Sequence, residues 1–188
     1  MIALLCGLSG AGKTTLAKNI YSKLVERGIN AEIVDGDEYR ARLFKDLGFT
    51  KEDRFENIRR LGYIANKFSA HGIVTIVSAI NPYEAIRREL TETYPNVKII
   101  HIDCPVEKLM LRDTKGLYKR SMLPADHPDK IIILTGVNDQ FDIPADPDLY
   151  INTDMYDVEE SANVMLDFII SNMDPETAKK KQINSLLE

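Results

Sequence analysis

Short apolar runs alternate along this chain with longer segments in which apolar residues recur every three or four positions. The short runs are typical of strands buried on both faces, whereas the wider spacing is typical of amphipathic helices. Strands are predicted at 2–6, 31–34, 73–77, 97–102 and 149–151. Helices are predicted after residue 13, from about residue 54, from 82–83 to about residue 90, and over 158–173. We therefore expect an α/β fold with a five-stranded parallel sheet, covered by helices on both faces and binding ligands at the carboxyl ends of its strands.

A glycine-rich sequence follows the first predicted strand directly. Residues 7–14 read GLSGAGKT, which has the G-x-x-x-x-G-K-T spacing of a loop that binds nucleotide phosphates. Lys13 is placed to reach the β and γ phosphates, and the Thr14 hydroxyl to bind Mg2+. The alternative is a glycine-rich turn that binds no phosphate, which the flanking strand and helix disfavour. The residues predicted to bind ATP here are Gly7, Leu8, Ser9, Gly10, Ala11, Gly12, Lys13, Thr14 and Thr15.

Two carboxylates follow the second predicted strand, as Asp35 and Asp37 of an Asp-Gly-Asp turn. The third strand ends in Ser78 instead of the carboxylate that many phosphate-loop enzymes have there. The carboxylates of the turn are therefore expected above the sheet near the phosphate loop. Asp35 is assigned to the magnesium shell with Thr14, and Asp37 to the orientation of an acceptor hydroxyl. An ordinary surface turn is the alternative, and the position after a buried strand favours the site.

Composition and charge narrow the class of protein. The chain has 188 residues, 44% of them hydrophobic and 28% charged, which is typical of a globular protein. A net charge of −5 gives no general attraction to nucleic acid or to an anionic membrane, so a small nucleotide substrate is the expected partner. No apolar run approaches the roughly 18 residues of a membrane span, and no basic leader precedes the first strand, so a cytoplasmic protein is expected. We expect one domain at 1–175 and a solvated tail at 176–188 that contains the lysines at 179–181.

The cysteines and histidines give no sign of a metal site. Cys6 and Cys104 are read as small packed side chains, which need no oxidising compartment. His71, His101 and His127 lack the spacing of metal ligands and are read as structural or surface residues.

Six blocks of the sequence together resemble the adenylylsulfate (APS) kinase family. They are GLSGAGKTT, DGDEYR at 35–40, LGFTKEDRFENIRR at 47–60, SAINPYE at 78–84, RDTKGLYKR at 112–120 and LTGVND at 134–139. The blocks occur in the family's order over about residues 1–155. The resemblance implies a three-layer P-loop NTPase fold and transfer of the ATP γ-phosphoryl group to the 3'-hydroxyl of APS, which gives PAPS and ADP.

Arginines are dense around Phe49 and Asn57, which favours a second anion site with an aromatic ring for a nucleobase. The arginines are Arg40, Arg54, Arg59 and Arg60. The resemblance implies that Arg40, Arg54 and Asn57 bind the sulfate-phosphate end of APS. It also implies that Ile80 and Asn81 line the site and that Phe49 stacks on the adenine. The alternative is a charged helix face that pairs with Glu52, Asp53 and Glu56. We favour this alternative for Arg59 and the site for Arg40 and Arg54.

A segment without clear periodicity, at 113–133, is rich in lysine, arginine and proline. We read it as a lid that closes over the phosphates, with an exposed loop as the alternative. The resemblance implies that Lys115 contacts the substrate and that Arg112, at the start of the lid, lies over the ATP adenine.

Three departures from the family pattern leave the acceptor open. Asn81 replaces a serine, so direct transfer from ATP is expected without a phosphoserine. Leu134 replaces a phenylalanine that would stack on the APS adenine, and the lid sequence at 121–133 also differs. The rival functions are a kinase for another small anionic or amidated nucleotide, such as a cytidine diphosphate derivative, and a non-catalytic nucleotide-binding module. A homodimer is an open alternative to a monomer.

Overall fold

The computed structural model describes residues 1–173 and contains one parallel sheet of five strands. The order across the sheet is β2-β3-β1-β4-β5, and every neighbouring pair is parallel. The predicted α/β fold is therefore confirmed, and the strand ends lie within a residue or two of their predicted positions. The strands are β1 Ile2–Cys6, β2 Ala31–Asp35, β3 Val74–Ser78, β4 Val97–Asp103 and β5 Leu149–Asn152.

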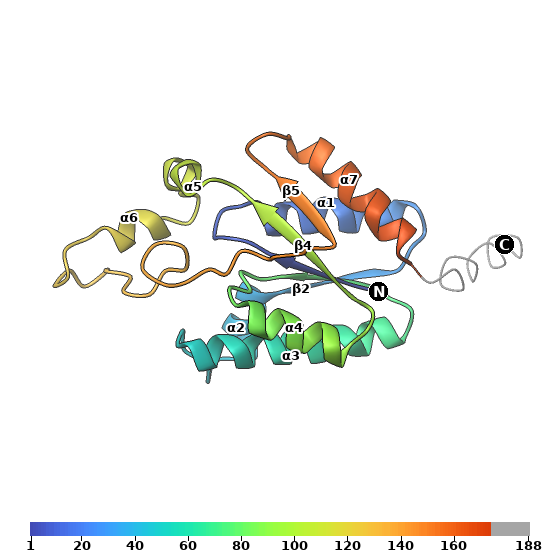
Figure 1. Ribbon diagram of the computed structural model, residues 1–188, viewed down its shortest axis with the longest axis horizontal. Coiled ribbons are helices and arrows are strands. Elements are labelled where there is room, and N and C mark those ends of the chain that lie inside the picture. The colour runs from blue at the N-terminus through green and yellow to red at the C-terminus, as the bar shows by residue number, and fades with distance from the viewer. Residues whose placement is uncertain (174–188) are drawn as a thin grey trace, which may run out of the picture.

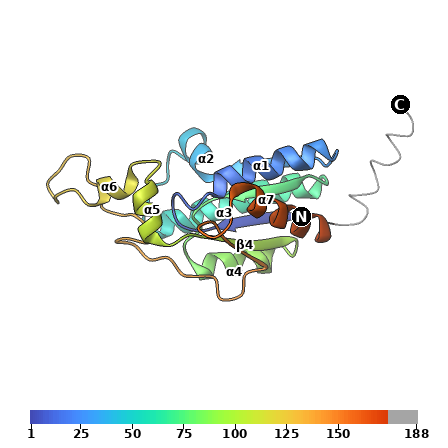
Figure 2. The same cartoon turned by 90° about the horizontal axis from the view of Figure 1, so that it is seen from above.

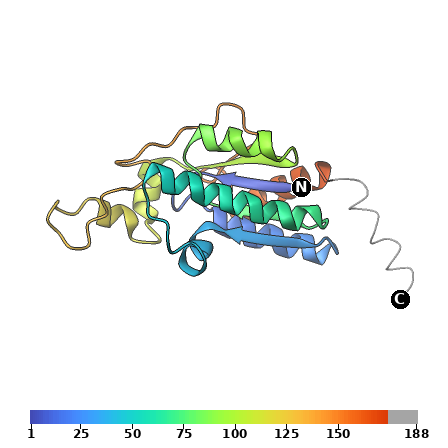
Figure 3. The same cartoon turned by 90° about the horizontal axis from the view of Figure 1, so that it is seen from below.

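Helices cover both faces of the sheet (Figure 1). Helices α1 and α7 pack together on one face, and α3 and α4 lie on the other, as Figure 3 shows from below. The helices are α1 Lys13–Glu26, α2 Gly36–Arg42, α3 Lys51–Ala70, α4 Glu84–Thr93, α5 Val106–Arg112, α6 Leu117–Ser121 and α7 Val158–Ser171.

The hydrophobic core has one part on each side of the sheet, because successive strand residues point to opposite faces. Ala3 and Leu5 of β1 pack with the α1 and α7 side, whereas Ile2, Leu4 and Cys6 pack with the α3 and α4 side. All five residues of β1 are buried. The central strand is thus held from both sides, and it delivers a rigid carboxyl end to the loop that follows it.

The Asp-Gly-Asp sequence is not the turn that we predicted. Gly36 and Asp37 form the first turn of α2, and Asp35 is the N-cap residue of that helix. The Asp35 side chain accepts hydrogen bonds from the backbone N–H groups of Asp37 (2.9 Å) and Glu38 (3.4 Å). Aspartate is a favoured N-cap, so the same residues that favour a turn also begin a helix here.

Helix α3 begins at Lys51, three residues before the predicted start near Arg54. Thr50 and Asp53 form a capping box, in which each side chain binds the backbone N–H of the other residue. This cap fixes where α3 begins and therefore the position of Arg54, the fourth residue of the helix, which lines the site.

Helix α6 and its flanking residues project beyond the sheet, past α5, at the end where the strands terminate (Figures 1 and 2). We call residues 113–133 the lid segment. It holds the five-residue helix α6, whereas the sequence showed no clear helical period there.

The cysteines and His101 are structural, as predicted. Cys6 and Cys104 are free and buried, and burial raises the pKa of the Cys6 thiol to about 12. His101 is buried beside the rings of Phe141 and Tyr150, with ring centroids 6.0 and 5.5 Å away. Within residues 1–173 no group of three or more His, Cys, Asp and Glu side chains is placed to bind a metal, and no helix has the length and apolar character of a membrane span. The predicted tail at 176–188 and its lysines lie outside the described residues.

Candidate functional site

The phosphate loop joins β1 to α1 at the carboxyl edge of the sheet. Gly7 has φ 148°, and a Cβ atom there would lie 2.1 Å from the carbonyl oxygen of Ile102 in β4. Gly12 has φ 98° and is the N-cap residue of α1. Both positions therefore require glycine, and the loop curls so that the N-terminus of α1 opens toward the site.

Lys13, the first residue of α1, is buried and folds back onto the loop. Its Nζ atom donates to the carbonyl oxygens of Gly7 and Leu8, both at 2.7 Å. Burial, together with the positive charge of Lys115, lowers the pKa of Lys13 to about 8. A bound phosphate would place negative charge beside this ammonium group and so favour its protonated form.

Three oxygen-bearing side chains meet beside the loop. The Thr14 hydroxyl donates to Oδ2 of Asp35 at 2.9 Å and lies 3.2 Å from the Ser78 hydroxyl. Hydroxyl and carboxylate oxygens suit Mg2+, so these residues fit the ion. The sequence predicted correctly that Thr14 and Asp35 lie together but assigned no role to Ser78. The position of Ser78 at the end of β3 could have indicated that role, because β3 pairs with β2 and places Ser78 opposite Asp35.

Asp37 lies between this cluster and the lid segment. Its Oδ2 atom accepts a hydrogen bond from Nζ of Lys115 at 2.5 Å. The two residues are 78 positions apart, and their contact joins α2 to the lid segment across the opening of the site. A carboxylate and a lysine thus lie together where the predicted acceptor hydroxyl would meet the phosphates.

The base of the lid segment is attached to the phosphate loop and closed on itself. The buried Tyr118 hydroxyl donates to the carbonyl oxygen of Ser9 at 2.8 Å. Nζ of Lys130 donates to the carbonyl oxygens of Ser121 (2.7 Å) and Leu123 (2.6 Å). We call residues 122–129 the lid tip. The two ends of the lid tip are therefore held together near the phosphate loop.

One cavity of about 850 Å³ connects the phosphate loop to the arginine-rich region. Lys13, Thr14, Asp35 and Asp37 line one part of it, and further lining comes from 48–50, 78–80 and 130–135. Leu134 is buried in this wall, and its backbone N–H donates to Oδ1 of Asn138 at 2.7 Å. The cavity has the size of a small-molecule site and offers apolar walls with a few polar groups.

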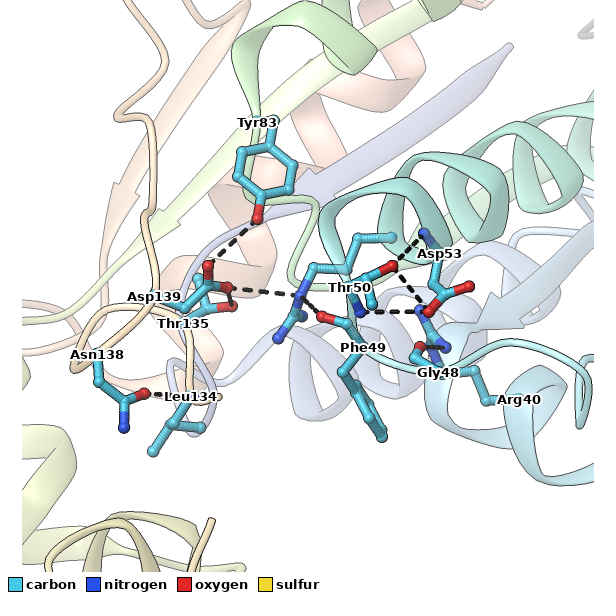
Figure 4. Close-up of polar contacts among 11 residues, drawn as sticks. Arg40, Gly48, Phe49, Thr50, Asp53, Tyr83, Leu134, Thr135, Asn138 and Asp139 are labelled. Atoms are coloured by element: carbon cyan, nitrogen blue, oxygen red, sulfur yellow. Dashed lines mark hydrogen bonds and ion pairs between the residues drawn. The ribbon is translucent and has the colours of Figure 1, made fainter. Parts of the chain in front are cut away.

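A smaller pocket of about 60 Å³ adjoins the arginines. Nη1 of Arg40 donates to the carbonyl oxygen of Gly48 at 2.7 Å, as Figure 4 shows. Nε of Arg54 donates to the carbonyl oxygen of Phe49 at 3.1 Å. The Cζ atoms of Arg40 and Arg54 lie 5.0 and 5.7 Å from the centre of the Phe49 ring. Partial burial and the neighbouring Arg54 charge lower the pKa of Arg40. Two guanidinium groups held this close favour an anion between them. The pocket is lined by Gly36, Asp37, Arg40, Phe49, Arg54, Asn57, Ile58, Ala79, Ile80, Asn81 and Pro82.

Two asparagine side chains in this pocket have buried polar atoms without a hydrogen-bond partner among residues 1–173. Asn81 is 1% exposed, has φ 48°, and neither its Nδ2 nor its Oδ1 atom has a hydrogen-bond partner in the described part of the chain. Oδ1 of Asn57 is also buried without a partner there. Buried polar groups are normally paired, so these atoms indicate a site for a polar ligand.

The other arginines do not enter the pocket. Arg59 pairs with Glu89 at 2.5 Å, and Arg60 pairs with Glu56 and Asp46 at 2.8 and 2.9 Å. The surface reading of Arg59 is correct, but its partner Glu89 belongs to α4 and was not predicted.

Arg112 lies apart from the main cavity, at the end of α5. Its Nη2 atom donates to the carbonyl oxygen of Thr153 at 3.3 Å, and the Thr153 hydroxyl donates to that of Ala11 at 3.0 Å. Arg112 therefore borders the outer side of the phosphate loop, where the base of a loop-bound nucleotide could extend.

Known proteins resemble this chain over most of its length. The family model for adenylylsulphate kinase matches residues 1–152. The adenylyl-sulfate kinase of Deinococcus deserti is 41% identical over 87% of this chain and 87% of the relative, and that of Microcystis aeruginosa is 41% identical over 84% of each. The solved structure of the Mycobacterium tuberculosis APS kinase CysC in complex with AMPPNP and APS is 32% identical, covers 89% of this chain and 96% of that chain, and has a TM-score of 0.82. The chain belongs to the adenylylsulphate kinase family.

Proposed function

We propose that this protein transfers the γ-phosphoryl group of ATP to the 3'-hydroxyl of APS, producing PAPS and ADP. The observation that carries the proposal is the juxtaposition of two anion sites around Asp37, which lines both the cavity at the phosphate loop and the arginine pocket. A kinase needs this arrangement because donor phosphate and acceptor hydroxyl must meet in line.

The phosphate loop, residues 7–15, binds the ATP phosphates through its backbone N–H groups and Lys13. Thr14 and Asp35 would hold Mg2+, and when bound the ion neutralises charge on the phosphates. On ATP binding, Lys13 exchanges its bonds to the Gly7 and Leu8 carbonyls for bonds to phosphate oxygens. Arg112 packs over the adenine of ATP.

Asp37 orients the acceptor hydroxyl and accepts its proton as the new bond to phosphorus forms. In the structure its carboxylate accepts a hydrogen bond from Lys115. When the substrates bind, Lys115 turns to the transferring phosphoryl group and frees Asp37 for the hydroxyl. The lid segment excludes water during this step, which prevents hydrolysis of ATP.

The acceptor lies along the opposite wall. Arg40, Arg54 and Asn57 bind its anionic end, Phe49 stacks on its base, and Ile80, Asn81 and Leu134 line the remaining surface. The cation-rich surroundings of Phe49 suit a ligand that combines a ring with an anion.

The test is release of ADP by the wild-type protein with ATP and Mg2+, with and without APS. The proposal requires stimulation by APS and a product phosphorylated at the 3' position. ATP binding without stimulation by any acceptor in a nucleotide screen would identify the non-catalytic module instead.

A second acceptor class is favoured by the amide of Asn81, whose polar atoms have no hydrogen-bond partner within residues 1–173. Because Nδ2 donates and Oδ1 accepts, its full satisfaction needs a ligand that brings both an acceptor and a donor. An ionised sulfate group brings acceptors only, whereas an amidated phosphate brings both. Leu134 also leaves the wall without a second ring for adenine. A cytidine diphosphate derivative with an amidated end is the specific candidate, and higher kcat/KM with it than with APS would select it.

We further propose a cytoplasmic location, a single kinase domain over 1–175 and a homodimer. Light scattering on the purified protein distinguishes a dimer from a monomer.

A further inference from the structure

Asp139 lies just outside both cavities and contacts three different parts of the chain (Figure 4). Its Oδ2 atom accepts a hydrogen bond from the Thr135 hydroxyl (3.1 Å), and its Oδ1 atom accepts one from the Tyr83 hydroxyl (3.3 Å). Oδ2 also lies 3.5 Å from Nε of Arg54 in α3. One carboxylate thus joins α3, the segment before α4 and the loop that carries Leu134.

Arg54 is constrained by these contacts on one edge only. Its side chain is 8% exposed, and Nε faces both Asp139 and the Phe49 carbonyl oxygen. Within residues 1–173, its Nη1 and Nη2 atoms make no hydrogen bond, and Arg54 lines both cavities. Holding the Nε edge leaves the outer N–H groups of the guanidinium fork available to an anion.

The loop on the other side of Asp139 forms the wall of the main cavity. Thr135 and Asp139 form an isolated bridge, and the N–H of Gly136 donates to the Asp139 carbonyl oxygen at 2.8 Å. Leu134 directly precedes this closed loop. Any movement of the Asp139 carboxylate therefore moves the Arg54 edge and the wall that carries Leu134 together.

We propose that Asp139 is a positioning residue for the acceptor. It orients the Arg54 guanidinium toward the anionic end of the acceptor. It also holds the 134–139 loop, which forms part of the wall of the main cavity, in place. The inference rests on the proposed function, because it assigns acceptor binding to Arg54. The sequence around 139 shows no sign of this role, since the residues that it joins are 85 and 56 positions away.

The first test is Asp139→Asn, which keeps the size of the side chain and removes its charge. The KM for APS should rise about tenfold, as expected for two residues in contact, while the KM for ATP should change less than about twofold. Asp142→Asn is the matched control: this carboxylate caps α4 through the Glu84 N–H at 2.9 Å and makes no contact with Arg54. The control should leave both KM values within about twofold of wild type. Thermal melts of both variants check that the fold is retained.

The second test is a double-mutant cycle with Arg54→Ala. Because Asp139 acts on Arg54 and also on the 134–139 loop, adding Asp139→Asn to Arg54→Ala should change the KM for APS by clearly less than the tenfold expected in the wild-type background. An equal change in both backgrounds, or an unchanged KM in Asp139→Asn alone, would overturn the proposal. The wild-type protein tests the underlying function separately: if it fails to use APS, the acceptor assignment is wrong, and the same cycle is then run with the acceptor found in the screen.

Discussion

Raising the pH above 8 should weaken ATP binding, because Lys13 loses its proton there. Burial against the loop, with a contribution from Lys115, lowers its pKa from 10.5 to about 8. The difference of about 2.5 pH units, at 1.36 kcal/mol per unit, corresponds to about 3.4 kcal/mol against the charged lysine in the nucleotide-free loop. The phosphates of ATP restore the charged form, so binding takes up a proton wherever free Lys13 is partly neutral.

The expected dependence follows from the fraction of Lys13 that is protonated. That fraction falls from about nine-tenths at pH 7 to about one-half at pH 8 and one-tenth at pH 9, so the Kd for ATP should rise about tenfold between pH 7 and pH 9. Isothermal titration calorimetry at these pH values measures the Kd. Titration at pH 8 in buffers of different ionisation enthalpy should reveal uptake of about half a proton per ATP.

Lys13→Arg is the control, since its guanidinium keeps its charge throughout this range. The variant should lose the tenfold change whatever its absolute affinity. An ATP affinity that is equal at pH 7 and pH 9 in the wild-type protein would refute the reasoning. The sign for stability is opposite: the folded pKa lies below the unfolded one, so the unfolded state binds more protons between pH 8 and 10.5, and this group raises the free energy of unfolding as pH rises through that window.

Three further outcomes test the site. Asp37→Asn should lower kcat by about 10²- to 10⁴-fold with little change in the Kd for ATP, measured by rapid-quench turnover and by calorimetry; a matching loss of ATP affinity would instead assign Asp37 to nucleotide binding. Leu134→Phe should lower the KM for APS about 2- to 12-fold, from the ~0.5–1.5 kcal/mol of an added ring contact, whereas Leu134→Met should not; a rise in that KM would favour the smaller base. Gly7→Ala should destabilise the protein by more than about 3 kcal/mol in urea unfolding, because its Cβ would lie 2.1 Å from the Ile102 carbonyl oxygen; stability close to wild type would contradict the tight approach of the loop to β4.

The sheet and the phosphate loop were predictable because their signals are local. The strands are continuous apolar runs, and the loop depends on glycine, lysine and threonine at fixed spacing. Helix α2 was missed because Asp-Gly-Asp is compatible with a turn as well as with an N-cap, and only the bonds from Asp35 to the following N–H groups decide between them. The early start of α3 could have been read from Thr50 and Asp53, whose spacing is that of a capping box.

The arrangement of the acceptor region depends on contacts between residues far apart in the chain. The pairing of Arg54 with Asp139 spans 85 positions, and that of Asp37 with Lys115 spans 78. Local charge patterns suggested partners for Arg54 within its own helix turn, but its guanidinium is turned away from them by the bond from Nε to the Phe49 carbonyl. Such choices are decided by tertiary packing, which the order of residues alone does not display.

Because the two ends of the lid tip are joined by hydrogen bonds, the sequence and length of residues 122–129 can vary independently of the rest of the protein. Lys130 holds the two ends of this stretch together, and Tyr118 anchors the preceding helix to the phosphate loop, so a change in the tip is not transmitted to either substrate site. Because doubling the length of a loop costs only about 0.6 kcal/mol of closure entropy, insertions and deletions there are tolerated. The part of the unusual lid sequence at 122–129 is therefore compatible with an unaltered catalytic centre, whereas residues 130–133 line the main cavity. Tips from relatives could be grafted between Ser121 and Lys130 without rebuilding the enzyme.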